Sequence, residues 1–100
     1  MTGGRVLVVD DDAGIRTVVS EALRRDGHVV HAVGSLSAQA EALLRFAPDV
    51  LVTDVVLPDG NGLDAVPRVL SQRPDLPVIV LSAQNTLTTA VRATERGAFE

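Results

Sequence analysis

Residues 5–16 read RVLVVDDDAGIR, and this stretch determines the fold class and poses the functional question. Its apolar part, from Val6 to Val9, is short and rich in β-branched residues, which predicts a buried strand. The consecutive aspartates Asp10, Asp11 and Asp12 follow that strand directly. Because adjacent negative charges repel one another, these aspartates either begin a helix or hold a cation.

Short apolar segments alternate with helical patterns along the rest of the chain. The sequence predicts strands at 5–9, 28–33, 49–54 and 76–82, and helices at 13–27, 35–48, 63–74 and 85–98. The segment LPDGNG at 57–62 is typical of a turn. Pro67 suits the first turn of its helix and removes one hydrogen bond if it lies deeper. This alternation predicts an α/β fold with a parallel sheet covered on both faces.

Composition narrows the possible functions. A chain of 100 residues that is 46% hydrophobic has the size and composition of one domain with a buried core. The chain has no Cys, which excludes disulfides and thiolate chemistry, and all of its basic residues are Arg. The net charge of −4 argues against nucleic-acid binding by this surface. Because no apolar run is long enough to span a membrane, we expect a cytoplasmic domain without membrane contact.

Polar side chains follow the strands on the edge where such sheets bind ligands. Asp10, Asp11 and Asp12 follow the first strand, Asp54 ends the third, and Ser82 ends the fourth. In a flavodoxin-like order the first and third strands are neighbours, so their carboxylates meet. Grouped carboxylates suit a hard cation such as Mg²⁺, and such a site suits phosphoryl chemistry.

Each of these residues also has a structural explanation. Asp12 suits a helix N-cap, Asp54 a turn, and Ser82 a strand end or helix cap. Asp59 and Asp64 fit turn or capping positions in the same way. We expect Arg5 and Arg16 near the aspartates, with Arg16 partly screening Asp12 from one helical turn away. A functional site is indicated because these polar residues follow strands at the same edge of the predicted sheet, and not by any one of them alone.

Four segments together resemble a known family. VLVVDDDAGIR, PDVLVTDVVLPDGNGLD, PVIVLSA and ERGAFE are similar to the receiver domains of two-component response regulators, and the similarity extends over the whole chain. Details such as VVDDD and GAFE look closest to the NtrC-type regulators of transcription. The resemblance implies a doubly wound, flavodoxin-like (βα)₅ fold with strand order 2-1-3-4-5.

The resemblance also implies roles for individual residues. Asp54 matches the phospho-acceptor and Ser82 the switch hydroxyl that moves toward the phosphoryl group. The implied Mg²⁺ ligands are Asp11, Asp10, Asp54 and the backbone carbonyl of Val56, while Pro58 and Gly62 shape the loop after the acceptor. The phosphoryl group would come from a sensor histidine kinase. The domain would not be an enzyme in its own right, although it would assist its own phosphorylation and dephosphorylation.

The sequence departs from the family pattern at its C-terminal end. The family has a lysine at the end of the fifth strand, whereas this chain contains no Lys and ends at Glu100. We therefore expect residues 1–100 to be the N-terminal part of one receiver domain in a longer regulator, lacking the fifth strand and last helix. Without the fifth strand, the edge of the sheet would be exposed. We therefore expect a homodimer through the fourth helix region, at 85–96, or through this sheet edge.

Two other functions fit part of the pattern. In a phosphatase of the haloacid-dehalogenase type, Asp10 would be the nucleophile and Asp12 the acid/base, but Asp54 and Ser82 would then have no role. A receiver-like interaction module that works without phosphorylation is the second alternative, because the lysine is absent.

Overall fold

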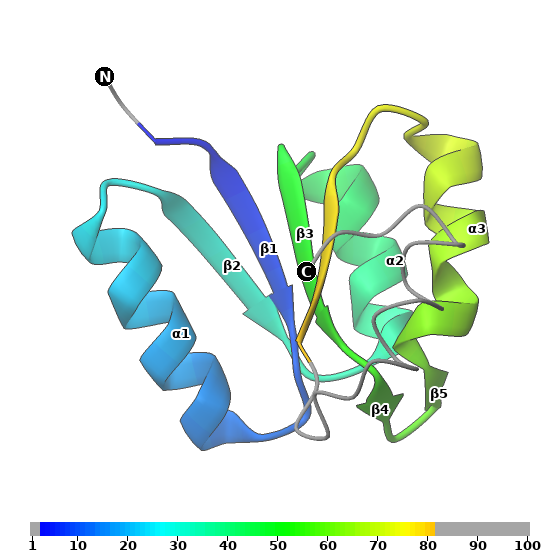
Figure 1. The fold of residues 1–100 in the computed structure, drawn as a ribbon, viewed down its shortest axis with the longest axis horizontal. Helices are drawn as coiled ribbons and strands as arrows, with labels where there is room; N and C mark the ends of the chain where they lie inside the picture. Colours follow the sequence, from blue (N-terminus) through cyan, green and yellow to red (C-terminus); the bar gives the residue numbers. More distant parts are fainter. Residues whose placement is uncertain (1–2, 82–100) are drawn as a thin grey trace.

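The predicted strands form one parallel sheet in a computed structural model that describes residues 3–81. Figure 1 shows the elements, whose bounds are β1 (Arg5–Val9), α1 (Ala13–Arg25), β2 (Val29–Val33), α2 (Leu36–Arg45), β3 (Val50–Asp54), β4 (Val56–Leu57), β5 (Gly60–Asn61), α3 (Gly62–Gln72) and β6 (Val78–Leu81). The expected helix at 85–98 and the residue Ser82 lie outside the described residues.

The sheet has the strand order β2-β1-β3-β6, with every neighbouring pair parallel. For these four strands the flavodoxin-like order is therefore confirmed. The helix α1 covers one face, and α2 and α3 cover the other (Figure 1). β1 lies between β2 and β3, and the register pairs Val9 with Val33 on one side and with Thr53 on the other.

The central strands explain why the sheet needs cover on both faces. Leu7 and Val9 of β1 belong to one core cluster, which also contains residues of α2 and α3. Val6 and Val8 belong to a second cluster, against which Val19 and Leu23 of α1 pack. Because successive side chains of a strand point to opposite faces, an almost wholly apolar strand requires helices on both sides.

Polar side chains fix the beginning of each helix. Asp12 caps α1 by accepting a hydrogen bond from the backbone N–H of Ile15, and Ser35 caps α2 through Ala38. Asn61 caps α3. These caps satisfy backbone donors that have no partner within the helix.

The helices end earlier than the pattern predicted. α1 stops at Arg25 and not at 27, where Gly27 turns the chain with φ of 91°. α2 stops at Arg45 and not at 48, because Ala47 adopts a left-handed φ of 49° before Pro48. A left-handed residue ends a helix whether or not it is glycine, so the ends are set by the backbone conformation that follows.

The segment after β3 is more ordered than the turn predicted at 57–62. β4 and β5 pair as a short antiparallel hairpin, and α3 begins directly after it. Pro67 lies inside α3, beyond its first turn. Because proline has no backbone N–H, the carbonyl of Leu63 receives no hydrogen bond from Pro67. This is the missing hydrogen bond predicted for a proline beyond the first turn. Within the described residues, no helix is long and apolar enough to cross a membrane.

Candidate functional site

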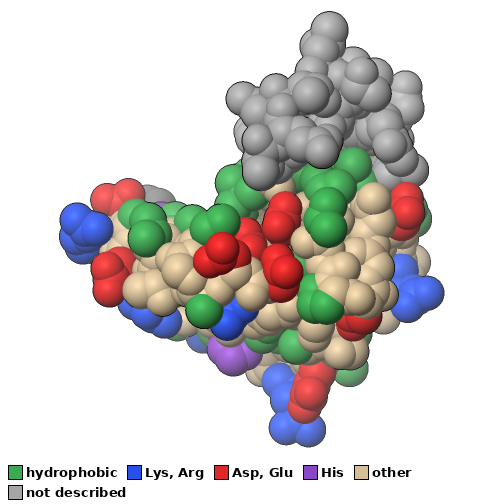
Figure 2. Space-filling view, turned by 90° about the horizontal axis from the view of Figure 1, so that it is seen from below, with side chains coloured by type: hydrophobic (Ala, Val, Ile, Leu, Met, Phe, Trp, Pro, Cys, Tyr) green, Lys and Arg blue, Asp and Glu red, His purple; other side chains and the backbone are tan. Residues whose placement is uncertain are grey.

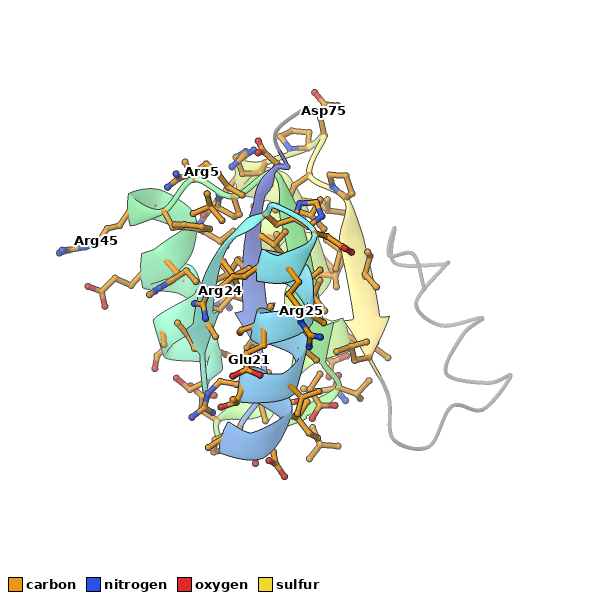
Figure 3. All side chains as sticks on the ribbon, turned by 90° about the vertical axis from the view of Figure 1, so that its left-hand side faces the viewer. Arg5, Glu21, Arg24, Arg25, Arg45 and Asp75 are labelled. Atoms are coloured by element: carbon orange, nitrogen blue, oxygen red, sulfur yellow. The ribbon has the colours of Figure 1, made fainter. Side chains whose placement is uncertain are left out.

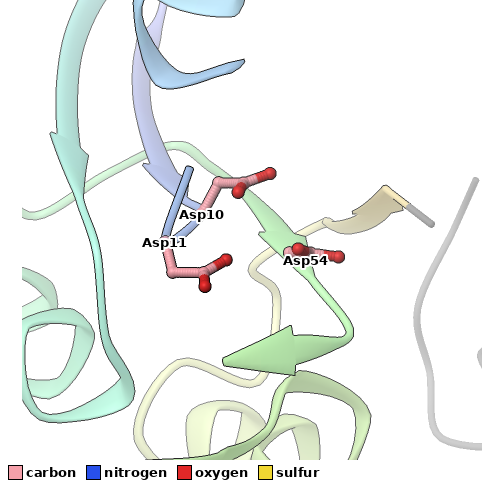
Figure 4. A group of neighbouring side chains, drawn as sticks. All are labelled: Asp10, Asp11 and Asp54. Atoms are coloured by element: carbon pink, nitrogen blue, oxygen red, sulfur yellow. The ribbon is translucent and has the colours of Figure 1, made fainter. Parts of the chain in front are cut away.

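Three carboxylates meet at the carboxyl ends of β1 and β3. Asp10 and Asp11 follow β1, Asp54 ends β3, and one ligand oxygen from each lies within 4.8 Å of the others. Figure 4 shows the three side chains pointing into the same space, and we refer to them as the acid cluster. In Figure 2, which looks onto this end of the sheet, acidic side chains gather near the middle of the surface. The predicted meeting of these carboxylates is therefore observed.

Asp10 is the buried member of the acid cluster. The residue is only 3% exposed, and its Oδ1 accepts a hydrogen bond of 2.9 Å from the backbone N–H of Asp12. This contact leaves Oδ2 as the oxygen with no described hydrogen bond. Asp11, in contrast, is exposed, and among the described residues its carboxylate accepts no hydrogen bond. The two adjacent acids therefore differ sharply in how firmly they are held.

Asp54 lies at an intermediate depth. Burial raises the pKa of its carboxyl above the ordinary value of 3.8, and the charges of Asp10 and Asp11 raise it further. The backbone N–H groups of Val55 and Val56 act in the opposite direction, and Val55 donates to Oδ1 over 2.7 Å. A cation in the cluster would favour the charged carboxylate and lower this pKa.

The donor set of the acid cluster fits a hard divalent cation. Carboxylate oxygens are the ligands that Mg²⁺ prefers, and Mg²⁺ usually takes one or two of them and completes its shell with water and phosphate oxygens. Within residues 3–81 no cationic side chain forms an ion pair with the cluster, and the nearby Arg16 donates to the Asp10 carbonyl and not to a carboxylate. Val56 begins β4 two residues after Asp54, where the sequence predicts a backbone carbonyl ligand, and this role stays a prediction.

Arg5 lies far from the position expected for it. Arg5 begins β1 at the opposite end of the sheet, where its guanidinium donates to the carbonyl of Phe46 and lies 4.2 Å above that ring. Figure 3 shows Arg5 close to the end that carries Asp75. Its expected place near the acids was wrong because the first residue of a parallel strand lies a full strand length from the last.

Arg16 does lie near the acid cluster, but its partner is not Asp12. Its Nη1 donates to the backbone carbonyl of Asp10 over 2.6 Å, while the carboxylate of Asp12 caps α1. Within the described residues no ion pair joins Arg16 and Asp12, and partial screening of Asp12 by the Arg16 charge stays a prediction. Their spacing of one turn suggested a side-chain pair, but the end of β1 offers Arg16 a closer acceptor.

Two further residues shape the loop after Asp54. Asp59 accepts hydrogen bonds from the backbone N–H groups of Leu36 and Ser37, at 2.8 and 3.0 Å, and so caps α2 from another element. Gly62 donates to the carbonyl of Val55 over 2.7 Å, and a methyl group on Gly62 would overlap the carbonyl oxygen of Asp54. Asp59 was predicted as a turn or capping residue, but its partner helix cannot be read from local sequence.

Comparisons with known proteins agree with this geometry. Residues 6–100 match the family described as response regulator receiver domain. The chain is 53% identical over its whole length to the DNA-binding transcriptional regulator NtrC of Azospirillum brasilense, and it covers 21% of that protein. It is 43% identical, over 82% of its length, to a probable transcriptional regulatory protein, TcrX, of Mycobacterium tuberculosis, and covers 35% of that protein. The chain thus spans about a fifth of the length of the NtrC relatives it matches.

Solved structures give the same result. NtrX from Brucella abortus in complex with ADP superimposes with a TM-score of 0.91 at 31% identity, covering 98% of this chain and 23% of that one. The beryllofluoride-activated NtrC4 receiver domain dimer superimposes with a TM-score of 0.89 at 33% identity, covering 96% of this chain and 79% of that one.

Proposed function

The chain belongs to the response regulator receiver domain family, of the kind found in NtrC- and NtrX-type two-component regulators, and we propose that Asp54 is its phospho-acceptor. The observation that supports this role is the acid cluster, in which Asp54 meets Asp10 and Asp11 within 4.8 Å at the carboxyl edge of the sheet. The phosphatase alternative is not favoured, because Asp12 uses its carboxylate to cap α1 and Asp54 is the third member of the cluster.

The proposed reaction is a phosphoryl transfer. A carboxylate oxygen of Asp54 attacks the phosphorus of a phosphohistidine on a sensor histidine kinase. The P–N bond breaks, its electron pair stays on the imidazole nitrogen, and a P–O bond forms to give an acyl phosphate. The backbone N–H of Val55 donates to Oδ1 of Asp54 and so orients the carboxylate for this attack. In the later dephosphorylation, water attacks the phosphorus of the acyl phosphate, the P–O bond to Asp54 breaks with its electron pair left on the carboxylate, and inorganic phosphate is released.

The chain's own carboxylates prepare the site for a cation. Asp10 and Asp11, with Asp54 and the Val56 carbonyl, would hold Mg²⁺, which when bound offsets the negative charge of the incoming phosphoryl group. Asp10 contributes a rigid, buried oxygen, because its other oxygen is occupied by the N–H of Asp12. Asp11 contributes an exposed carboxylate that can adjust to the ion.

The downstream consequences are part of the same proposal. The phosphoryl group on Asp54 would carry about −1.5 to −2 units of charge in place of the single negative charge of the carboxylate, and Ser82 would turn to hydrogen-bond it. We assign residues 1–100 to a single receiver domain whose output in the whole protein is regulation of transcription. The support for that output is the NtrC name shared by several similar regulators.

Acetyl phosphate provides the direct test. We expect the protein, incubated with acetyl phosphate and Mg²⁺, to gain the mass of one phosphoryl group, and Asp54→Asn to abolish the gain. Asp12→Asn is the matched control, because Asn caps helices as well as Asp does, and it should still be phosphorylated. Phosphorylation that persists in Asp54→Asn but disappears in Asp10→Asn would instead assign the nucleophile to Asp10.

Assembly is a further part of the proposal. One similar structure, at 33% identity, is a receiver domain dimer in its beryllofluoride-activated state. We expect this receiver domain also to dimerise when activated, through the region at 85–96 or the sheet edge. Light scattering with and without beryllofluoride and Mg²⁺ tests this expectation, and an unchanged monomer mass in both conditions would contradict it.

A further inference from the structure

Asp10 has almost all of its polar groups occupied. Its N–H donates to the carbonyl of Val33 over 3.0 Å, and its Oδ1 accepts from Asp12 over 2.9 Å. Its carbonyl accepts from Nη1 of Arg16 over 2.6 Å, the shortest of the three contacts. The first two contacts come from neighbouring backbone. The third comes from a charged side chain that reaches back from α1.

The place of the Arg16 guanidinium depends on Gly34. A Cβ atom on Gly34 would lie 3.0 Å from Nη1 of Arg16, closer than ordinary van der Waals contact, so a side chain there would crowd the guanidinium. Arg16 itself is only partly exposed. The guanidinium therefore lies between the end of β1 and the residue that follows β2, in space that the missing side chain of Gly34 leaves open.

The contact with the Asp10 carbonyl also bears on Asp11. That carbonyl belongs to the peptide unit between Asp10 and Asp11, so a bond to it restricts rotation of the unit. Among the described residues, none donates a hydrogen bond to the Asp11 carboxylate. The backbone therefore fixes only the point from which the Asp11 side chain starts, and Arg16 holds the peptide unit that precedes it.

We propose that Arg16 is a positioning residue, which holds the Asp10–Asp11 peptide so that both carboxylates face Asp54. Its donor is used on a carbonyl and not on a carboxylate, so the oxygens of the acid cluster stay available to a cation. An arginine paired with one of these carboxylates would instead occupy the oxygens that the metal needs. This inference rests on the proposed function, in which the acid cluster binds Mg²⁺.

The positive charge of Arg16 and its hydrogen bond to the Asp10 carbonyl have opposite effects on Mg²⁺ affinity. The direction of the change in affinity therefore tests the proposal. A positive charge near the acid cluster weakens cation binding, so removing the charge alone would make Mg²⁺ bind more tightly. Removing the contact that holds the peptide would make Mg²⁺ bind more weakly. Loss of a hydrogen bond that orients a metal ligand commonly weakens metal binding by about 10- to 100-fold.

The experiment measures Mg²⁺ affinity in the intact protein by calorimetric titration, with urea unfolding in parallel. We expect Arg16→Met to weaken Mg²⁺ binding by about tenfold or more. Arg16→Lys, which keeps one donor, should recover part of the loss. The matched control is Arg24→Met, because Arg24 also lies on α1 and donates to a strand carbonyl, that of Val30, over 3.2 Å. Its Mg²⁺ affinity should equal that of the wild type.

Gly34→Ala provides a second test that leaves Arg16 in place. The added methyl group crowds the guanidinium, and we expect weaker Mg²⁺ binding from this variant as well. Unchanged or tighter Mg²⁺ binding by the folded Arg16→Met protein would refute the positioning role. If Arg16→Met does not fold, unchanged affinity in Gly34→Ala would refute it. A wild-type protein that binds no Mg²⁺ would instead show that the proposed function has failed.

Discussion

Replacing Asp54 by Asn should stabilise the protein in the absence of Mg²⁺. The carboxylate of Asp54 lies within 4.8 Å of those of Asp10 and Asp11, which are more than forty residues away in sequence. These two repulsions therefore arise only when the chain folds. Asn has the same shape, and its Oδ1 can still accept the hydrogen bond that Val55 donates to Asp54. The substitution removes the charge and keeps the contact.

The size of the effect follows from Coulomb's law. Two unit charges about 5 Å apart interact by about 0.8 kcal/mol in the dielectric of water, and physiological salt screens about half of that. Removing Asp54 eliminates two such repulsions, so the free energy of unfolding should rise by about 1 kcal/mol in 0.15 M salt. In 1 M salt the gain should fall below about 0.5 kcal/mol, because the Debye length is then only about 3 Å.

Urea unfolding followed by circular dichroism, without Mg²⁺ and at several salt concentrations, measures this gain. Asp75→Asn is the control, since Asp75 is an exposed acid at the opposite end of the sheet (Figure 3), and its stability should stay within about 0.5 kcal/mol of the wild type. Mg²⁺ should stabilise the wild type more than Asp54→Asn, because only the wild type offers three carboxylates. A loss of stability in Asp54→Asn, or a gain that does not depend on salt, would refute the reasoning.

Three further predictions concern residues that shape the helices and the loop. Ala47→Gly should raise the free energy of unfolding by about 1 kcal/mol in urea titrations, because Ala47 has a left-handed φ of 49° and glycine adopts it without strain; an unchanged or lower value would contradict this. Asp59→Asn should lower stability at neutral pH. The N–H groups of Leu36 and Ser37 hold the pKa of Asp59 below 3.8, so its charged form stabilises the fold above that pH and the effect is lost as pH falls through the lowered pKa. Unfolding curves of both proteins from pH 7 to pH 3 check this, and a difference that grows in acid would contradict it. Gly62→Ala should cost about 2 kcal/mol or more, because its methyl group overlaps the Asp54 carbonyl; thermal unfolding close to that of the wild type would contradict the close contact.

The fold could be predicted because its signals are local. The apolar segment at Val6 to Val9 and the helical pattern after it specify a strand and a helix wherever they lie in space. The meeting of Asp10, Asp11 and Asp54 also followed, once the first and third strands were taken as neighbours. Parallel neighbours bring their carboxyl ends to one edge, and so two distant sequence positions become one site.

The contacts that the sequence did not predict are long-range or depend on backbone conformation. Helical spacing suggested that Arg16 pairs with Asp12, but Arg16 bonds to the carbonyl of Asp10 in the loop between β1 and α1. Asp59 caps a helix that begins 23 residues earlier, and no local pattern indicates that partner. The end of α2 at Arg45 depends on the left-handed conformation of Ala47, an uncommon conformation for alanine.

The close approach of Gly62 to Asp54 has a mechanical consequence. Where a helix packs on the sheet through side chains, those side chains absorb small displacements by changing rotamer. Between Asp54 and α3 no side chain intervenes, since Gly62 lies against the Asp54 carbonyl and bonds to the carbonyl of Val55. This junction is therefore stiff. A displacement of the Asp54 backbone should therefore move the start of α3 with it, so the position of α3 would report strain at Asp54.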